Sequence, residues 1–120
     1  MYTIHYDAAA RTLHIVTRGF WTPGVTAGFI AELLARGTTI RLRHGSFTVL
    51  ADLRAAAIQL PQVVDALAAM MPRALKVTSL PIAAVVANNL AKLQTERYLV
   101  GANCRTFLDP AEAQRWLAAA

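Results

Sequence analysis

The sequence predicts an α/β fold, and two kinds of pattern lead to this prediction. Two N-terminal segments alternate apolar and polar residues, which is typical of paired strands with one buried face. Further along, short apolar runs alternate with helical patterns, which indicates parallel strands joined by helical crossovers. We therefore expect a mixed, mostly parallel sheet of about five strands, with an N-terminal antiparallel hairpin and about four helices.

Length and composition are typical of a single domain over residues 1–120. A chain of 120 residues can bury a sizeable core. Hydrophobic residues make up 56% of it, but 24 of them are alanine, so much of this fraction reflects helices. Charged residues make up 16%, which is too few for a disordered tail.

The N-terminal segments predict a hairpin and then a long helix. Residues 2–6 and 12–18 form the expected strands. A helix starts at Thr22-Pro23, where a hydroxyl N-cap precedes a proline. Gly37 is one candidate for its end, and the residues after it alternate like a strand. Ile40, however, continues the apolar stripe, so we expect the helix to reach about His44-Gly45.

Two apolar runs predict central strands that are buried on both faces. They are residues 47–53 (FTVLADL) and 81–87 (PIAAVVA). A helix opens at Pro61 after the first run, and Pro72 is expected to close or kink it.

The last third of the chain repeats the strand-helix pattern. Asn88 or Asn89 can cap a helix over residues 89–99. Residues 104–107 predict a short last strand, and Asp109 is the N-cap of a final helix.

Polar side chains follow the central strands, where open α/β sheets bind ligands. Asp52 and Arg54 lie at the end of the first strand, and Asn88 and Asn89 follow the second. With Gln59 they form the predicted binding rim. An alternative stays open: Asp52 orders its loop, Arg54 is solvated or paired, and the asparagines cap a helix.

No set of residues in the sequence amounts to a catalytic centre. A carboxylate beside an arginine stays ionised, which poorly suits a general base. His5 and His14 fall on one face of the hairpin, but a zinc site needs three or four ligands. The glycines are isolated and form no phosphate-binding loop. We expect a protein that is not an enzyme and holds no metal or cofactor.

Several large apolar side chains have two interpretations. They can line a cavity between the first two helices and the sheet, or they can form ordinary core, and methionine suits either. The residues concerned are Trp21, Phe29, Leu33, Leu34, Met70 and Met71. Trp21 packs beside the helix start in one interpretation and is an exposed contact residue in the other.

Charge and cysteine content narrow the class of partner. The net charge is +5, but most basic residues are scattered singly along the chain. The one cluster, Arg41, Arg43 and His44, is expected to lie near a helix end. We therefore do not expect nucleic-acid binding. Cys104 is the one cysteine, no signal peptide is recognisable, and no apolar run could cross a bilayer. The prediction is a cytoplasmic protein without a transmembrane segment.

Four motifs in order resemble the SpoIIAA-like branch of the STAS superfamily, the sulfate-transporter and anti-sigma-factor-antagonist domains. They are RGFWT (18–22), VLADLR (49–54), IAAVVANNLAKLQTER (82–97) and RTFLDPAEAQRWL (105–117). The resemblance implies a small mixed sheet with helices packed around it, in agreement with the prediction from patterns.

The resemblance also implies a regulatory protein-interaction domain, but without the usual switch. Family members with the switch carry a phosphorylatable serine at the start of the helix after VLADLR. Here Ala55 to Gln62 hold no serine, threonine or glycine, and the serines, Ser46 and Ser79, lie elsewhere. We therefore expect a non-catalytic domain that binds a protein partner or a second copy of itself. Because some relatives look similar to lipid-carrying CRAL-TRIO domains, a carrier of a small apolar molecule is the alternative.

Overall fold

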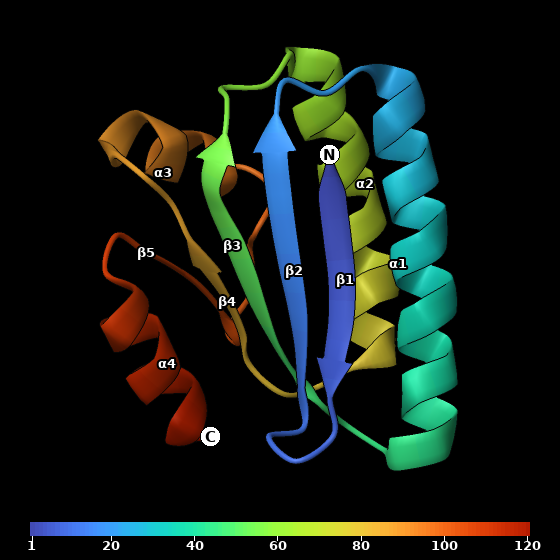
Figure 1. The fold of residues 1–120 in the computed structure, drawn as a ribbon. Helices are drawn as coiled ribbons and strands as arrows, with labels where there is room; N and C mark the ends of the chain where they lie inside the picture. Colours follow the sequence, from blue (N-terminus) through green and yellow to red (C-terminus); the bar gives the residue numbers. More distant parts are fainter.

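The computed structural model describes residues 1–120 and contains one mixed five-stranded sheet with four helices (Figure 1). The strands are β1 (Tyr2–Asp7), β2 (Thr12–Gly19), β3 (Thr48–Ala56), β4 (Ile82–Val85) and β5 (Cys104–Phe107). They lie in the sheet in chain order, with β1 antiparallel to β2 and the other neighbours parallel. The helices are α1 (Pro23–His44), α2 (Pro61–Val77), α3 (Asn89–Thr95) and α4 (Pro110–Ala118). The predicted fold class is confirmed.

The helices cover the two faces of the sheet unequally. Crossovers between sequential parallel strands are right-handed and therefore place their helices on one face, which here is covered by α1, α2 and α3. The other face carries α4 alone, packed against β3, β4 and β5 (Figure 1). No helix lies over β1 and β2 on that side. We call this uncovered part the open face.

Helix α1 runs to His44, as predicted from its apolar stripe. Thr22 Oγ1 accepts a hydrogen bond from the Val25 N–H at 3.2 Å, and Gly45 ends the helix with φ +82°. Gly37 is a packing residue instead of a stop. A Cβ atom there would lie 3.2 Å from Val77 Cγ1, so the missing side chain lets α1 and α2 approach closely.

An aromatic cluster joins β1 to the start of α1. Trp21 is only 3% exposed, and its ring centroid lies 4.9 Å from that of Phe29 and 5.7 Å from that of Tyr2. The interpretation of Trp21 as an exposed contact residue is therefore wrong, and its packing interpretation is confirmed.

Three boundaries differ from the predictions. Helix α2 does not close at Pro72, because the residues beyond it continue the stripe that packs on the core as far as Val77. Helix α3 ends at Thr95 instead of residue 99, because Tyr98 and Leu99 turn toward the core. Strand β3 extends to Ala56, which pairs with Gly19 of β2.

Strand burial was predicted correctly for one central strand only. Every residue of β4 is buried, as expected. Strand β3 is not buried on both faces, because only Thr48 and Val49 are buried and its residues from Leu50 onward are partly or fully exposed. None of the helices is both long enough and apolar enough to span a bilayer.

Candidate functional site

Asp52 and Arg54 form an ion pair on the face of the sheet that carries α4. Arg54 donates from Nε to Asp52 Oδ1 at 3.0 Å and from Nη2 to Oδ2 at 2.9 Å. The Arg54 backbone N–H also donates to Oδ1, at 3.1 Å. These hydrogen bonds, above all those from the Arg54 side chain, lower the pKa of Asp52 against the opposing effect of its partial burial. The carboxylate stays charged, so it is poorly suited to accept a proton from a substrate.

A shallow groove of about 180 Å³ surrounds this pair, between the sheet and the start of α4. Its lining mixes apolar and polar side chains: His14, Ile15, Val16, Leu50, Asp52, Arg54, Val85, Pro110 and Gln114. His14 lies opposite His5 in the β1–β2 pair, as predicted, with ring centroids 6.5 Å apart. The structure contains no group of three or more His, Cys, Asp or Glu residues that could hold a metal ion.

Gln59 lies in the loop after β3 and has a structural role there. Its Oε1 accepts from the Trp21 N–H at 2.8 Å, and its Nε2 donates to the Gly19 carbonyl at 2.9 Å and the Ala57 carbonyl at 2.8 Å. The side chain therefore ties the end of β2 to the loop after β3. Its polar atoms are already engaged within the protein.

Asn88 and Asn89 lie at the start of α3. Asn88 Oδ1 accepts from the Ala91 N–H at 2.8 Å, so this residue is the N-cap that the alternative interpretation predicted. Asn89 is the first helical residue and is exposed. The structure brings the five predicted rim residues into two separate groups, because Asp52 and Arg54 point to the side of α4 while Gln59 and the asparagines lie by the loops.

A cluster of exposed apolar side chains surrounds those loops, and the sequence interpretation missed it. The residues lie after the carboxyl ends of three parallel strands, so they share one edge of the sheet. We call them the apolar edge: Phe20 (51% exposed), Ile58 (41%), Leu60 (37%), Leu90 (62%) and Leu93 (63%). Large apolar residues between the predicted strands and helices, Phe20, Ile58 and Leu60, were the available signal.

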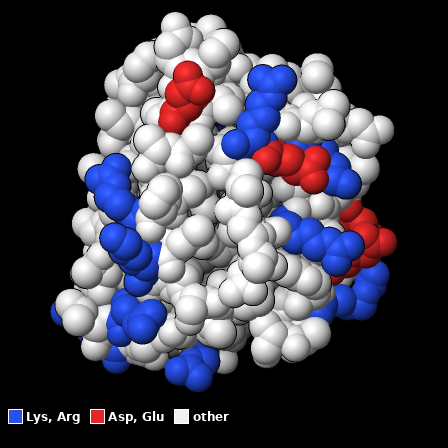
Figure 2. Space-filling view, turned by 180° about the vertical axis from the view of Figure 1, so that it is seen from behind, with Lys and Arg blue, Asp and Glu red and all other residues white.

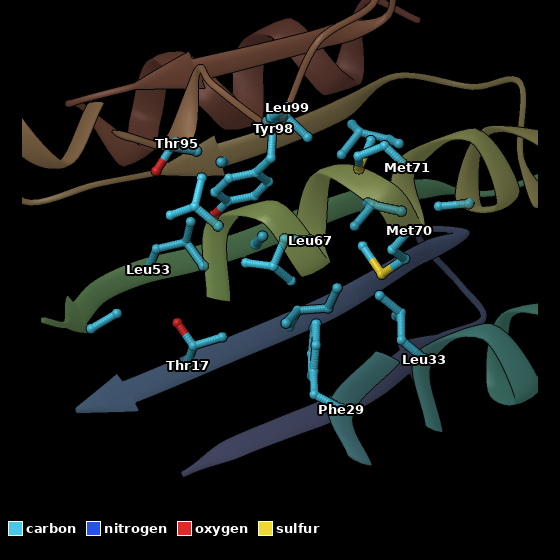
Figure 3. Close-up of a pocket in the computed structure, with 18 of the residues that line it drawn as sticks. Thr17, Phe29, Leu33, Leu53, Leu67, Met70, Met71, Thr95, Tyr98 and Leu99 are labelled. Carbon is cyan, nitrogen blue, oxygen red and sulfur yellow. The ribbon is translucent and has the colours of Figure 1, made fainter. Parts of the chain in front are cut away.

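A cavity of about 140 Å³ lies between the sheet and the helices that cover it (Figure 3). Of its 31 lining residues, 25 are hydrophobic, and none carries a charge. The lining includes all six residues for which a cavity was one interpretation: Trp21, Phe29, Leu33, Leu34, Met70 and Met71.

The remaining reactive and charged groups have structural explanations. Cys104 is half-buried, and this burial raises the pKa of its thiol. Arg41 Nη1 donates to the Val77 carbonyl at 3.0 Å, and Arg11 Nη2 donates to the His44 carbonyl at 3.3 Å, so both guanidinium groups lie at helix carboxyl ends. On the side covered by α1 and α2, cationic side chains lie around a largely uncharged centre (Figure 2).

Comparison with known proteins supports the fold at the level of structure and not of sequence. No protein-family model matches the chain, and no curated protein has a significantly similar sequence. A solved structure of the anti-sigma factor antagonist SpoIIAA in its unphosphorylated form is similar over 99% of this chain and 97% of that chain, with a TM-score of 0.61. The chain has the SpoIIAA fold. Because sequence identity is 11%, this likeness shows the fold alone.

Within this SpoIIAA fold, the start of α2 carries no hydroxyl group. Leu60 is the N-cap, it makes no side-chain capping hydrogen bond, and Pro61 and Gln62 follow. The structural similarity to SpoIIAA confirms the resemblance inferred from the motifs at the level of the fold.

Proposed function

We propose that this protein is a non-catalytic regulatory domain that binds a protein partner through the apolar edge. The observation that carries the proposal is the exposure of five large apolar side chains on the loops after β2 and β3 and on α3, which follows β4. Single exposed apolar residues are common, but a group gathered on one edge indicates a contact surface. The SpoIIAA fold supports a regulatory role by analogy.

The interaction differs from a phosphorylation switch. The loop after β3 and the start of α2 hold no serine or threonine, so a kinase has no acceptor there. The Asp52–Arg54 pair is engaged internally, and Cys104 has a raised pKa, so neither offers an activated catalytic group. Binding without covalent modification is the function that fits these residues.

The charges of the same segments favour an acidic partner. Arg18, Lys92 and Arg97 lie beside the apolar edge in sequence, and Glu96 is the carboxylate among them. The whole chain carries a net charge of +5. A partner that presents apolar side chains within a negatively charged surface would complement both features.

Site-specific photocrosslinking in cells tests this proposal. A photoreactive residue at Ile58 should capture the same acidic protein as one at Leu93, and one at Leu42 should not. Leu42 is 83% exposed but lies at the far end of α1, so it is a matched control.

Affinity measurements with the purified partner then test whether the apolar edge is the interface. Ile58→Glu and Leu93→Glu should each weaken binding at least about tenfold, whereas Leu42→Glu should leave it unchanged. Equal binding by all three variants, each shown to be folded by circular dichroism, would exclude the apolar edge as the interface.

A second candidate function rests on the cavity. A folded protein with an internal apolar space can bind a small apolar molecule, and the six predicted lining residues support this alternative. The support comes from the cavity itself, independently of any likeness to CRAL-TRIO domains.

A further inference from the structure

We propose that the cavity binds a compact, neutral, ring-shaped molecule and rejects both long acyl chains and organic anions. This inference rests on the second candidate function and narrows it to one class of ligand. It is independent of the apolar edge and its protein partner.

The volume of the cavity limits the size of the ligand. It measures about 140 Å³, whereas pockets for drug-sized molecules usually hold about 300–1,000 Å³. An engineered cavity of about 150 Å³ in another protein, lined by Leu, Ile and Phe, binds benzene. A single ring with one or two small substituents therefore fits the space, whereas a long chain would have to leave much of its length outside it.

The absence of charge from the lining limits the ionisation state of the ligand. None of the 31 lining residues is Lys, Arg, His, Asp or Glu. An anionic or cationic ligand would lose its hydration without gaining a counter-ion, which is strongly unfavourable. Fatty acids and aromatic carboxylates are excluded for this reason even where their rings or chains would fit.

The lining has a polar end and an apolar end. Thr17, Thr95 and Tyr98 lie toward the carboxyl ends of the strands, and Met70 and Leu33 lie toward the other end (Figure 3). Thr17 is buried, and its side chain contributes one of the few polar groups in the lining. Burial raises the pKa of Tyr98, so its hydroxyl stays protonated. One neutral polar substituent on the ring can be accommodated at this end.

The walls suit a flat ring. Phe29 and Trp21 contribute aromatic surfaces, and Met70 and Met71 contribute thioethers that adapt to irregular shapes. The lining also includes two half-buried residues, Gln59 in the loop after β3 and Gln94 in α3, so the polar end is also the end nearest to solvent.

Nuclear magnetic resonance titration of the full chain with three probes tests the proposal. Toluene and benzoate have similar shapes and differ in charge, and 1-dodecanol is neutral but long. Toluene should produce saturable shifts at Thr17, Leu67 and Tyr98, with a Kd of about 1 mM or tighter. Benzoate and 1-dodecanol should produce none at these residues. Absence of saturable toluene shifts, or equal binding of benzoate or 1-dodecanol, would overturn the proposal.

Cavity-filling variants locate the binding. Ala84 of β4 is buried and lines the cavity, so Ala84→Val should weaken toluene binding at least tenfold. Ala51→Val, on β3, makes the same test if Ala84→Val does not fold. Ala55→Val is the control, because Ala55 is exposed on β3 and lies outside the lining. Unchanged affinity in a folded cavity variant would contradict the assignment.

Ile58→Glu should retain toluene binding, so failure of the partner proposal and failure of this one are distinguishable.

Discussion

Gln59 and Gln94 hold each other through a reciprocal pair of hydrogen bonds, although 35 residues separate them in sequence. The Gln59 N–H donates to Gln94 Oε1 at 2.9 Å, and Gln94 Nε2 donates to the Gln59 carbonyl at 2.9 Å. The Gln94 side chain thus satisfies both backbone groups of a residue in the loop after β3. Helix α3 has seven residues, of which only Thr95 is buried. We infer that this pair is the main link between α3 and the rest of the protein.

Replacing Gln94 should loosen α3 without unfolding the sheet. Gln94→Ala leaves two backbone groups of Gln59 without a protein partner, so we expect a loss of about 1–2 kcal/mol in the free energy of unfolding. Amide hydrogen exchange over residues 89–99 should accelerate about tenfold or more, while exchange in β2 and β4 changes only as global stability falls. Gln62→Ala, at an exposed position in α2, is the control. Unchanged exchange in α3 would show that other contacts hold it.

The Asp52–Arg54 pair should make stability depend on pH in the acid range. Because the pKa of Asp52 is lowered in the folded state, protonation favours unfolding. The stabilising contribution is present above the ordinary aspartate pKa of about 3.9 and is lost as pH falls through the lowered folded-state value. The side chains are 32% and 50% exposed, so solvent screening keeps the effect small.

Urea unfolding measures this contribution when the free energies of unfolding of the wild-type protein and Asp52→Asn are compared from about pH 2 to about pH 7, a range that includes the titration of a carboxylate. The stability difference should be present at neutral pH and shrink toward the acid limit. Adding 1 M salt, at which the Debye length is about 3 Å, should reduce it. A difference that is constant across the pH range would mean that the ionised carboxylate does not stabilise the fold.

Replacing Thr106 with valine should make the protein more stable. Its hydroxyl is buried in β5 and has no hydrogen-bond partner, which costs free energy in the folded state. Thr106→Val has nearly the same shape, so we expect the free energy of unfolding to rise by about 1 kcal/mol.

A bonded threonine provides the comparison for Thr106. Thr48 Oγ1 lies 2.8 Å from Thr12 Oγ1, so Thr48→Val should lower the free energy of unfolding by about 1–2 kcal/mol. Chemical denaturation of both variants checks the pair. A destabilised Thr106→Val protein would indicate that the hydroxyl has a partner, such as an ordered water molecule.

Pro72 should be replaceable with a gain in stability. It is exposed and lies inside α2, where proline removes a hydrogen bond and its ring clashes with the preceding turn. Pro72→Ala should raise the free energy of unfolding by about 1–2 kcal/mol, since part of the gain is offset by a more flexible unfolded chain. Pro61→Ala is the control, because proline at the first helical position costs nothing there. Equal changes in the two variants would argue against helix strain at Pro72.

The order and type of elements were predictable because they arise from local patterns. The Thr22-Pro23 start and the apolar stripe past Gly37 correctly gave a helix to His44, and alternation gave the hairpin. A helix end at Pro72, one of the two effects expected of this proline, and a helix end at Leu99 are not observed, for a shared reason. Packing of Val77 keeps α2 helical beyond its proline, and packing of Tyr98 and Leu99 stops α3 early.

The candidate sites were less predictable, because side-chain direction depends on register and on distant partners. Asp52 and Gln59 are seven residues apart and were expected on one rim. Asp52 points to the side of α4, where Arg54 pairs with it, and the polar atoms of Gln59 bind Trp21 and Gly19.

The sequence by itself determined the α/β class, the strand order of the hairpin, the helix caps and the apolar character of the cavity lining, since these follow from residue types within a few positions. Only the tertiary structure decided that the lining surrounds a space of about 140 Å³ and that five exposed apolar residues lie along one edge, because both depend on how segments far apart in sequence pack together.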